Sequence, residues 1–395
     1  MILVELFDLV SVENVSGFLL LEPRKVVFLG ETEKINAALE AYREIAQKRG
    51  KNIEFFSCAI EKNNLSKIVQ TMQKILEECF KQYPNEEIVI DLGGGDDLAL
   101  VAAGIIYEMY KGKIQLQRFS IATGCMIDCD EGTVISDAFT GKFSVEEYIM
   151  INGGKVKCSV GLHSSGNHRE IDAEFEKDIL AMWNICKENP SSWNRNVNAI
   201  GNTSGGMVYV EKSFLRRMST AGLIKNYKEK YGGRVSFDFK NNNVKRCLTK
   251  SGTLLEFYVT LGALKMKDEK GEYVYNDVMT GVQIDWPHDG NNEIDIENEI
   301  DVILTRDLVP VFISCKNGAF TSEELYKFSV VAARFGGEYV KKVLVTPYIN
   351  KKEASKEEIL AMRPAQRKEY SKRRQLLARA EKMGIEIIGA EVLYV

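Results

Sequence analysis

Acidic residues are concentrated in one short stretch of the sequence. Between residues 285 and 301 there are seven carboxylates and neither lysine nor arginine, in a chain with only three histidines. Carboxylate oxygens of this kind favour hard cations such as Mg²⁺ or Mn²⁺. The alternating pattern that ends this stretch and continues beyond it predicts two strands of a hairpin, over Glu299–Leu304 and Val309–Cys315.

Such a hairpin would assemble groups that can hydrolyse a phosphate ester. Alternate residues of a strand share a face, so the second strand would bring Ser314 and Lys316 beside Asp301. Asp301 could hold a cation that polarises a phosphate and lowers the pKa of a bound water. Lys316 could orient that water or neutralise charge in the transition state. A further acid, Glu256, interrupts the apolar run of a helix predicted over Thr253–Leu264, which gives it a reason to face a site.

A second candidate site lies in the first half of the chain. The segment 93–97, Gly-Gly-Gly-Asp-Asp, follows a predicted strand over Glu87–Asp91 and precedes an apolar helix. Glycines let backbone amides approach a ligand closely, and a helix N-terminus favours anions. The two aspartates would repel phosphate, however, and the pattern is neither a P-loop nor a GxGxxG fingerprint. Taken alone, the segment indicates a tight turn in which an aspartate caps the next helix.

Strands and helices alternate through the first 125 residues. Short apolar runs predict the strands, and apolar residues at helical spacing predict the helices between them. The predicted strands are the N-terminal run from Met1, Val26–Leu29, Ile53–Ser57, Glu87–Asp91 and Ile114–Ile121. The predicted helices between them are Lys34–Lys48, Leu65–Phe80 and Leu98–Tyr110. The order indicates an α/β fold with a parallel, doubly wound sheet, whose ligands bind at the C-terminal ends of strands near a topological switch point.

The middle of the chain is basic. Between Glu211 and Lys250 there are 11 Lys and Arg residues against three Asp and Glu. Helices are predicted over Ala173–Cys186 and Lys212–Leu223, and an alternating strand over Arg234–Phe239. This order suggests a small winged-helix-like module, and the alternative is a solvated basic linker.

The last third combines helices with short strands. Beyond the hairpin, the pattern predicts helices over Ser322–Phe335 and Lys351–Arg374 and strands over Lys342–Thr346 and Ile385–Ile388. Another strand could follow over Glu391–Val395. The order indicates a mixed sheet flanked by helices. Residues 351–374 carry nine Lys and Arg against four Glu, so this helix and the basic middle could both follow a phosphate backbone. We place the domains at 1–150, 151–246 and 247–395.

The composition excludes several classes of protein. With 395 residues, 45% hydrophobic and 27% charged, the chain is neither collagen-like nor wholly disordered, and a net charge of −4 excludes a uniformly basic nucleic-acid coat protein. None of the eight cysteines has CxxC spacing, which argues against a structural zinc site and predicts reduced thiols in a cytoplasmic protein. We expect neither a signal peptide nor a membrane span.

The order of the acidic and basic groups in the last third resembles the PD-(D/E)xK nuclease fold. The residues that carry the resemblance are Glu256 on a helix, Asp301 on a strand, and Ser314 and Lys316 on the next strand. The resemblance extends from Leu248 to the closing strands. It implies a metal-dependent nuclease in which these four residues form the catalytic site, with Glu256 and Asp301 placing the metal.

The chain departs from this family's motif at one position. The motif's second acid, two residues before the lysine, is Ser314 here, and a serine hydroxyl is a poor metal ligand. Either Glu299, on the same face as Asp301, or the backbone carbonyl of Cys315 could supply the missing oxygen.

A parallel-sheet domain with a late glycine loop, joined to such a nuclease domain, resembles the CARF-domain nucleases of type III CRISPR defence over nearly the whole chain. The resemblance implies a homodimer whose CARF half binds a cyclic oligoadenylate, usually the tetramer, across a two-fold axis. The pocket would be lined by the loop after the first strand and by the glycine loop, that is by Ser11, Val12, Glu13, Asn14, Gly93, Gly94, Gly95, Asp96 and Asp97. The CARF pattern more often has Thr at Gly93 and Thr-Lys at the two aspartates, which here could accept hydrogen bonds from ribose hydroxyls or adenine amino groups.

The resemblance therefore implies an endonuclease that depends on Mn²⁺ or Mg²⁺ and is activated by cyclic tetra-adenylate. Its substrate would be single-stranded DNA or RNA, or duplex DNA that it nicks. The main alternative is a cyclic-oligoadenylate-controlled winged-helix regulator that binds DNA and has an inactive nuclease domain, in keeping with Ser314 and the basic middle. A plain dinucleotide-binding enzyme is disfavoured, because no acceptor acid follows a GxGxxG loop.

Overall fold

The computed structural model describes residues 1–7, 11–159, 163–165, 172–202, 210–229, 234–285, 297–337, 339–347 and 354–390. The chain forms two compact units, the first made mainly of Met1–Lys155 and the second of most of the remaining chain. The region predicted as a separate connector therefore lies almost entirely within the second unit. None of the described helices is long and apolar enough to cross a membrane.

The first unit is built on a six-stranded sheet. Its strands are β1 (Ile2–Leu6), β2 (Lys25–Gly30), β3 (Glu54–Ala59), β4 (Ile88–Asp91), β5 (Gln115–Ser120) and β6 (Cys125–Asp128). Their order is β3-β2-β1-β4-β5-β6, and all neighbouring strands are parallel except β6, which runs antiparallel to β5. This confirms the predicted parallel, doubly wound sheet. From β1 the chain adds strands towards one edge of the sheet, and from β4 it adds them towards the other edge. The topological switch point therefore lies between β1 and β4.

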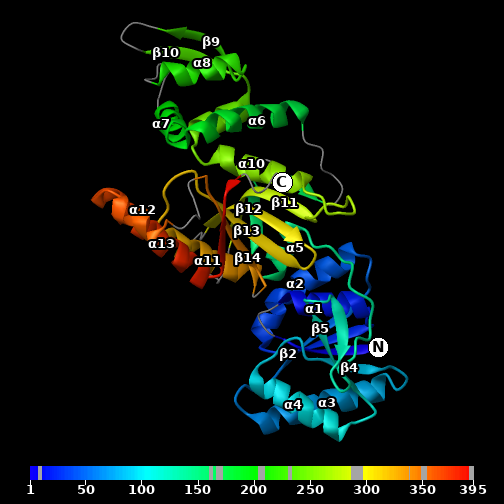
Figure 1. Ribbon diagram of the computed structural model, residues 1–395. Coiled ribbons are helices and arrows are strands. Elements are labelled where there is room, and N and C mark those ends of the chain that lie inside the picture. The colour runs from blue at the N-terminus through cyan, green and yellow to red at the C-terminus, as the bar shows by residue number, and fades with distance from the viewer. Residues whose placement is uncertain are drawn as a thin grey trace. The chain divides into compact units, whose positions relative to one another are not determined.

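Helices cover both faces of this sheet. They are α1 (Ser11–Leu21), α2 (Thr32–Lys48), α3 (Leu65–Gln82), α4 (Asp97–Met109) and α5 (Val145–Ile151). Figure 1 shows α1 and α2 on one face and α3 and α4 on the other. Alternation along β1 divides its side chains between these layers: Ile2, Val4 and Leu6 join the apolar core under α3 and α4. Glu5 must then point into the opposite layer, under α1.

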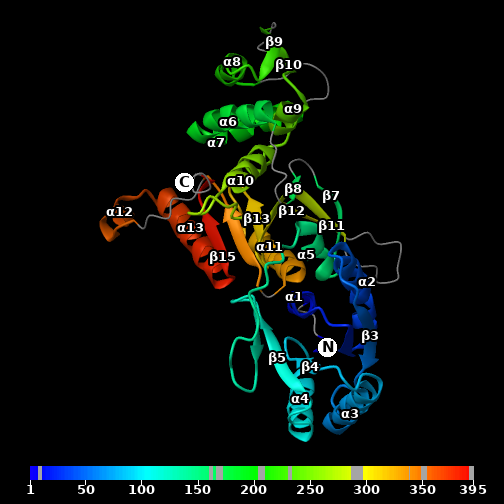
Figure 2. The ribbon, with the colours of Figure 1, turned by 90° about the vertical axis from the view of Figure 1, so that its right-hand side faces the viewer.

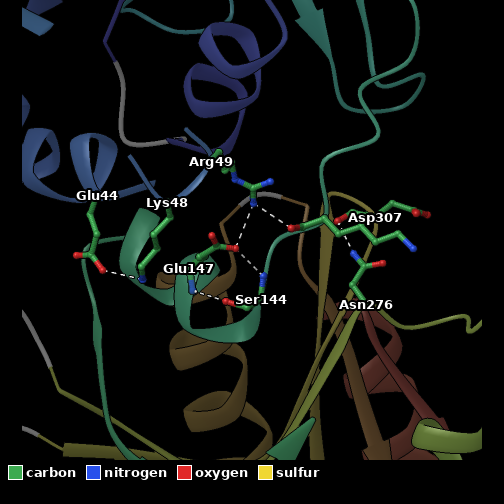
Figure 3. Close-up of polar contacts among 8 residues, drawn as sticks. Glu44, Lys48, Arg49, Ser144, Glu147, Asn276 and Asp307 are labelled. Carbon is green, nitrogen blue, oxygen red and sulfur yellow. Dashed lines mark hydrogen bonds and ion pairs between the residues drawn. The ribbon is translucent and has the colours of Figure 1, made fainter. Parts of the chain in front are cut away.

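Polar contacts join α2 to α5 within this unit. The guanidinium of Arg49, which follows α2, lies 3.2 Å from a carboxylate oxygen of Glu147 and donates a hydrogen bond of 2.9 Å to the carbonyl of Lys142 (Figure 3). Ser144 and Glu147 form a capping box that satisfies the first backbone amides of α5. These contacts fix the segment that follows the sheet.

The second unit contains a seven-stranded mixed sheet. Its strands are β7 (Lys155–Ser159), β8 (His163–Ser165), β11 (Asp277–Asp285), β12 (Glu297–Arg306), β13 (Val309–Cys315), β14 (Lys341–Val345) and β15 (Ile385–Ile388). The order is β15-β14-β13-β12-β11-β7, with β8 paired to β11. The strands β13, β14 and β15 are parallel, whereas β12 and β13 form an antiparallel hairpin. The mixed sheet and the hairpin confirm the sequence prediction.

A tight turn sets the register of the β12–β13 hairpin. Asp307 has a φ of +52°, in the left-handed region that aspartate tolerates better than most residues. The side-chain amide of Asn276, just before β11, donates a hydrogen bond of 3.0 Å to the carbonyl of Asp307 (Figure 3). The backbone amide of Asn276 also donates to the carbonyl of Thr305. This asparagine therefore ties the turn to the neighbouring strand.

Helices and a small hairpin complete the second unit. The helices are α6 (Ala173–Glu188), α7 (Pro190–Gly201), α8 (Lys212–Thr220), α9 (Asn242–Thr249), α10 (Thr253–Lys265), α11 (Ser322–Gly336), α12 (Lys356–Ala361) and α13 (Pro364–Lys382). The strands β9 (Ile224–Glu229) and β10 (Val235–Phe239) pair antiparallel directly after α8 (Figures 1 and 2). Helices followed by a two-stranded hairpin match the predicted winged-helix-like order.

Two predicted elements differ from the structure, and a third lies outside the described residues. Residues 11–14 were expected in a loop, but they form the first turn of α1, because buried packing of the helix outweighs its polar and glycine content. The single helix predicted over 351–374 is two helices, since Pro364 begins a new one at a position where proline is favoured. The possible strand Glu391–Val395 lies outside the described residues.

Candidate functional site

The β12–β13 hairpin places Asp301 opposite Ser314. Val302 pairs with Ile313, so the next residues along the two strands face each other. The Ser314 hydroxyl donates a hydrogen bond of 3.2 Å to Asp301 Oδ2, and the backbone N–H of Cys315 donates one of 2.6 Å to the same oxygen. Both bonds fix the carboxylate, and they show that the predicted proximity of Asp301 and Ser314 is correct.

Lys316 follows the end of β13 and lines the same pocket as Asp301. Its backbone N–H donates to the carbonyl of Val345 on β14, and its ammonium lies 3.6 Å from a carboxylate oxygen of Glu324 on α11. The pocket has a volume of about 230 Å³, and its wall includes Glu299, Asp301, Ser314 and Lys316. The hairpin thus brings these four predicted residues to one cavity.

Glu256 approaches this site from α10. The residues of α10 from Thr253 to Leu264 are all buried, and Glu256 is 8% exposed. Burial raises the pKa of Glu256 to about 7, and the negative charge of Asp301 adds to this effect. Burial likewise raises the pKa of Asp301, although the hydrogen bond from the Cys315 amide and the charge of Lys316 oppose the shift. Two largely buried carboxyl groups close enough to repel each other are a donor set that a divalent cation would satisfy.

The other predicted metal ligands are less well placed. The carboxylate of Glu299 is 44% exposed and lies 3.5 Å from the ammonium of Lys250. The side chain of Cys315 is buried, so only its backbone carbonyl is a candidate ligand. No cluster of three or more His, Cys, Asp or Glu side chains suited to a metal occurs among the described residues. A cation here would therefore need water or backbone oxygens in addition to Glu256 and Asp301.

The predicted ligand-binding loop lies at the switch point of the first unit. Asp91, at the end of β4, accepts a hydrogen bond of 2.6 Å from the N–H of Gly93, and Asp96 accepts one of 2.9 Å from the N–H of Ala99. Asp96 is thus the N-cap of α4, and Asp97 is its first residue. Gly95 has a φ of +96°, and a Cβ there would lie 2.8 Å from the Cβ of Leu6. Glycine is therefore required at position 95 for the loop to pack against the end of β1, and the predicted approach of the glycine amides to a ligand stays a prediction.

The residues predicted from the first loop are placed differently. Ser11 begins α1, and Val12, Glu13 and Asn14 are buried in its first turn. Glu13 nevertheless lies close to the glycine loop, since a Cβ on Gly93 would be 3.6 Å from the Cβ of Glu13. The structure therefore joins the two predicted segments through Glu13 and Gly93.

Sequence reasoning missed a pair of buried acids beneath α1. Glu5 and Asp91 are direct partners in the β1–β4 ladder, and each is at most 1% exposed. A Cβ on Gly17 of α1 would lie 3.1 Å from Asp91 Oδ2 and 3.4 Å from Glu5 Oε1. Burial raises the pKa of Asp91 to about 7, and burial together with Asp91 and Glu13 raises that of Glu5 well above its usual range. The sequence signal was a single acid in each apolar strand, in ILVEL and in IVID.

The fold matches solved structures along its whole length, although no protein-family model and no curated protein matches the chain. Protein VC1899 from Vibrio cholerae superposes with a TM-score of 0.72 and 16% identity, over 100% of this chain and 95% of that one. Can2 from Sulfobacillus thermosulfidooxidans, solved in complex with cyclic tetra-adenylate, gives a TM-score of 0.65 and 15% identity over 98% and 95% of the two chains. As the resemblance noted in the sequence predicted, this chain therefore shares the fold of Can2, a protein solved with cyclic tetra-adenylate, over nearly the whole of both chains.

Proposed function

We propose that this protein is a metal-dependent endonuclease activated by a cyclic oligoadenylate, with cyclic tetra-adenylate as the expected ring. The observation that carries the proposal is the pocket shared by Asp301 and Lys316, in which Asp301 is held by two hydrogen bonds from β13, with the buried Glu256 near enough for the charge of Asp301 to raise its pKa. The fold shared with Can2, which was solved in complex with cyclic tetra-adenylate, supports the choice of activator.

Each residue of the site would have a different role in hydrolysis. Glu256 and Asp301 would hold Mg²⁺ or Mn²⁺, with the Cys315 carbonyl, water or Glu299 completing the shell. A bound cation of this kind polarises the phosphate and favours ionisation of a water. Ser314 and the Cys315 amide keep the Asp301 carboxylate in one orientation. Lys316 neutralises negative charge that develops on the phosphate.

The activator would occupy the switch point of the first unit in a homodimer. A ring with two-fold symmetry requires the same loops from each subunit. Helix α4 begins at the glycine loop, and one of its faces is apolar and exposed within the single chain, with Leu100, Val101, Ile105 and Met109 each 38–52% exposed. Its opposite face packs on α3. We define Leu100, Val101, Ile105 and Met109 as the α4 face and assign it to the dimer interface.

A second function is favoured by two observations. Helix α8 is followed by the β9–β10 hairpin in a basic region, and Ser314 stands at the position of the motif's second acid. Both fit a regulator that binds duplex DNA and has lost nuclease activity.

Cleavage of labelled single-stranded DNA and RNA separates the two functions. With Mn²⁺ or Mg²⁺, we expect cleavage that rises strongly on addition of cyclic tetra-adenylate, and calorimetry should find about one ring per dimer. Binding of the ring without cleavage of either strand, combined with ring-dependent binding of duplex DNA, would favour the regulator.

A further inference from the structure

A second cavity in the second unit lies beside the nuclease pocket and is lined by none of the proposed catalytic residues. Its volume is about 660 Å³, within the range of pockets that hold small organic groups. The cavity lies between the basic helix α13, the loop that leaves β13, and the start of α7. We call it the α13 pocket and define it by Phe320, Glu369, Tyr370, Lys372, Arg373 and Leu376, which line it.

The loop between β13 and α11 connects this pocket to the catalytic lysine. Gly318 lines the α13 pocket, and Lys316 lines the nuclease pocket. These two residues are two positions apart in the chain, so their Cα atoms lie at most about 7 Å apart. Asn317 between them is 6% exposed, and its side-chain amide donates to Asn194 Oδ1 at 2.8 Å. Asn194 in turn donates to the carbonyl of Asn317. The short segment is therefore fixed, and the two pockets are adjacent.

The chemistry of the lining suits a nucleobase and its flanking phosphates. Phe320, Tyr370 and Leu376 offer apolar and aromatic surface, whereas Lys372 and Arg373 bring positive charge. The guanidinium of Arg373 lies 5.5 Å from the ring centroid of Tyr370, and its Nε is buried without a hydrogen-bond partner among the described residues. Glu369 could accept hydrogen bonds from an exocyclic amino group. Proteins that bind single strands combine stacking aromatics with a cationic groove in this way.

From these observations we infer that the α13 pocket binds one unstacked base of the strand that is cut, next to the scissile phosphate. This inference rests on the proposed nuclease function and adds a substrate requirement to it. A base can enter such a pocket only when it is free of its duplex partner, so the pocket selects single-stranded or locally opened substrate. Tyr370 is the positioning residue, because its half-buried ring forms the stacking surface.

The test compares two strands of equal charge, a uniform single-stranded oligonucleotide and an all-abasic strand of the same length. Their affinities are measured by fluorescence anisotropy with cyclic tetra-adenylate present, using the Asp301→Asn chain so that neither strand is cut. We expect the strand with bases to bind on the order of tenfold more tightly, since stacking of one base contributes roughly 1–3 kcal/mol. Adding Tyr370→Ala should remove most of this difference.

The conservative variant Tyr370→Phe is the matched control. It keeps the ring but loses the hydroxyl that accepts a hydrogen bond from the Ala354 amide at 3.1 Å. We expect it to keep the preference for the strand with bases. An undiminished preference in the Tyr370→Ala variant would overturn the inference, and so would the absence of any preference in the chain that retains Tyr370.

Cleavage mapping separates failure of this inference from failure of the proposed function. In the protein that retains Tyr370, a single abasic residue in a uniform strand should suppress cutting at one bond. That bond should lie at a fixed distance from the abasic position. Tyr370→Ala should cut all bonds evenly. Even cutting by both chains refutes the base pocket alone, whereas no cutting at any bond by the unaltered chain refutes the nuclease.

Discussion

At the scale of single residues, Asp301 keeps its orientation through donors from β13 and not through a second acid. The hydroxyl of Ser314 and the amide of Cys315 both donate to Oδ2, which leaves the other carboxylate oxygen available to a cation. The exposed carboxylate of Glu299 is engaged with Lys250. The geometry therefore favours water and the Cys315 carbonyl as the remaining ligands.

This preference gives a prediction about metal affinity. Glu299→Gln should leave the metal concentration for half-maximal cleavage almost unchanged, because Glu299 already pairs with a lysine in solvent. Ser314→Ala should raise that concentration only a few-fold, as it removes one of two hydrogen bonds to Asp301, each worth about 1 kcal/mol. A titration of cleavage against Mn²⁺ measures both. A rise in Glu299→Gln as large as that caused by loss of Glu256 would contradict this account.

The buried acids beneath α1 give a prediction about pH. The pKa of Asp91 is about 7 in the folded chain against an ordinary value of 3.8. The stability that Asp91 contributes is therefore fully present below pH 4 and is lost as the pH rises towards 7. Asp91→Asn, which stays neutral and can still accept the Gly93 bond, should raise the melting temperature by about 5 °C or more at pH 8 and by less at pH 5.

Differential scanning fluorimetry at the two pH values measures this effect. Asp97→Asn is the matched control, since Asp97 is exposed at the start of α4. The control should show the same change at both pH values. An equal shift for Asp91→Asn at pH 5 and pH 8 would show that this carboxyl group does not ionise over that range.

At the scale of elements, the packing of the glycine loop against β1 determines what the loop tolerates. Gly95 and Gly112 both have a positive φ, of +96° and +79°, but only Gly95 has a neighbour that a Cβ would strike. Gly95→Ala should therefore destabilise the first unit and weaken binding of cyclic tetra-adenylate by calorimetry. Gly112→Ala imposes backbone strain alone and should leave binding intact. Equal binding by both variants would place the activator away from this loop.

Much of the element order could be predicted from the sequence, and the exceptions have physical causes. The hairpin β12–β13 follows from its alternating pattern, and this alone brought Asp301 to Ser314. Helix α1 was missed because Ser16 and Gly17 are poor helix formers, and burial against the sheet determines its structure. Strand β11 was missed because Gly281, with a φ of +60°, lies in its middle and weakens the strand pattern, and because β7, one of its sheet neighbours, lies more than 100 residues earlier in the chain.

Residues of the candidate sites could be predicted where the local sequence pattern determines their position, but not where contacts with distant segments determine it. The acid on α10 and the acid and lysine of the hairpin could be named from spacing. The pairing of Glu5 with Asp91 depends on the order of the parallel sheet, which no local pattern states. The engagement of Glu299 by Lys250 likewise joins distant segments.

At the scale of the whole molecule, activation by a symmetric ring requires two copies. Val101→Glu, on the α4 face, should turn the proposed dimer into a monomer, because it would bury an unpaired charge in the apolar interface that we assign to this face. Light scattering after size exclusion measures the mass. Leu360→Glu is the control, since Leu360 is 73% exposed on α12, outside the α4 face, and should stay dimeric. A dimer that persists in Val101→Glu would place the interface elsewhere.

The central claim is that a ring bound in the first unit controls cleavage at Asp301 in the second. The most direct measurement uses Asp301→Ala and follows two signals in one preparation: calorimetric binding of cyclic tetra-adenylate, and cleavage of a labelled single strand with Mn²⁺. We predict that the ring binds as it does to the unaltered chain and that cleavage falls at least about a hundredfold, since a ligand of the proposed metal is lost. Undiminished, ring-dependent cleavage by Asp301→Ala would contradict the claim.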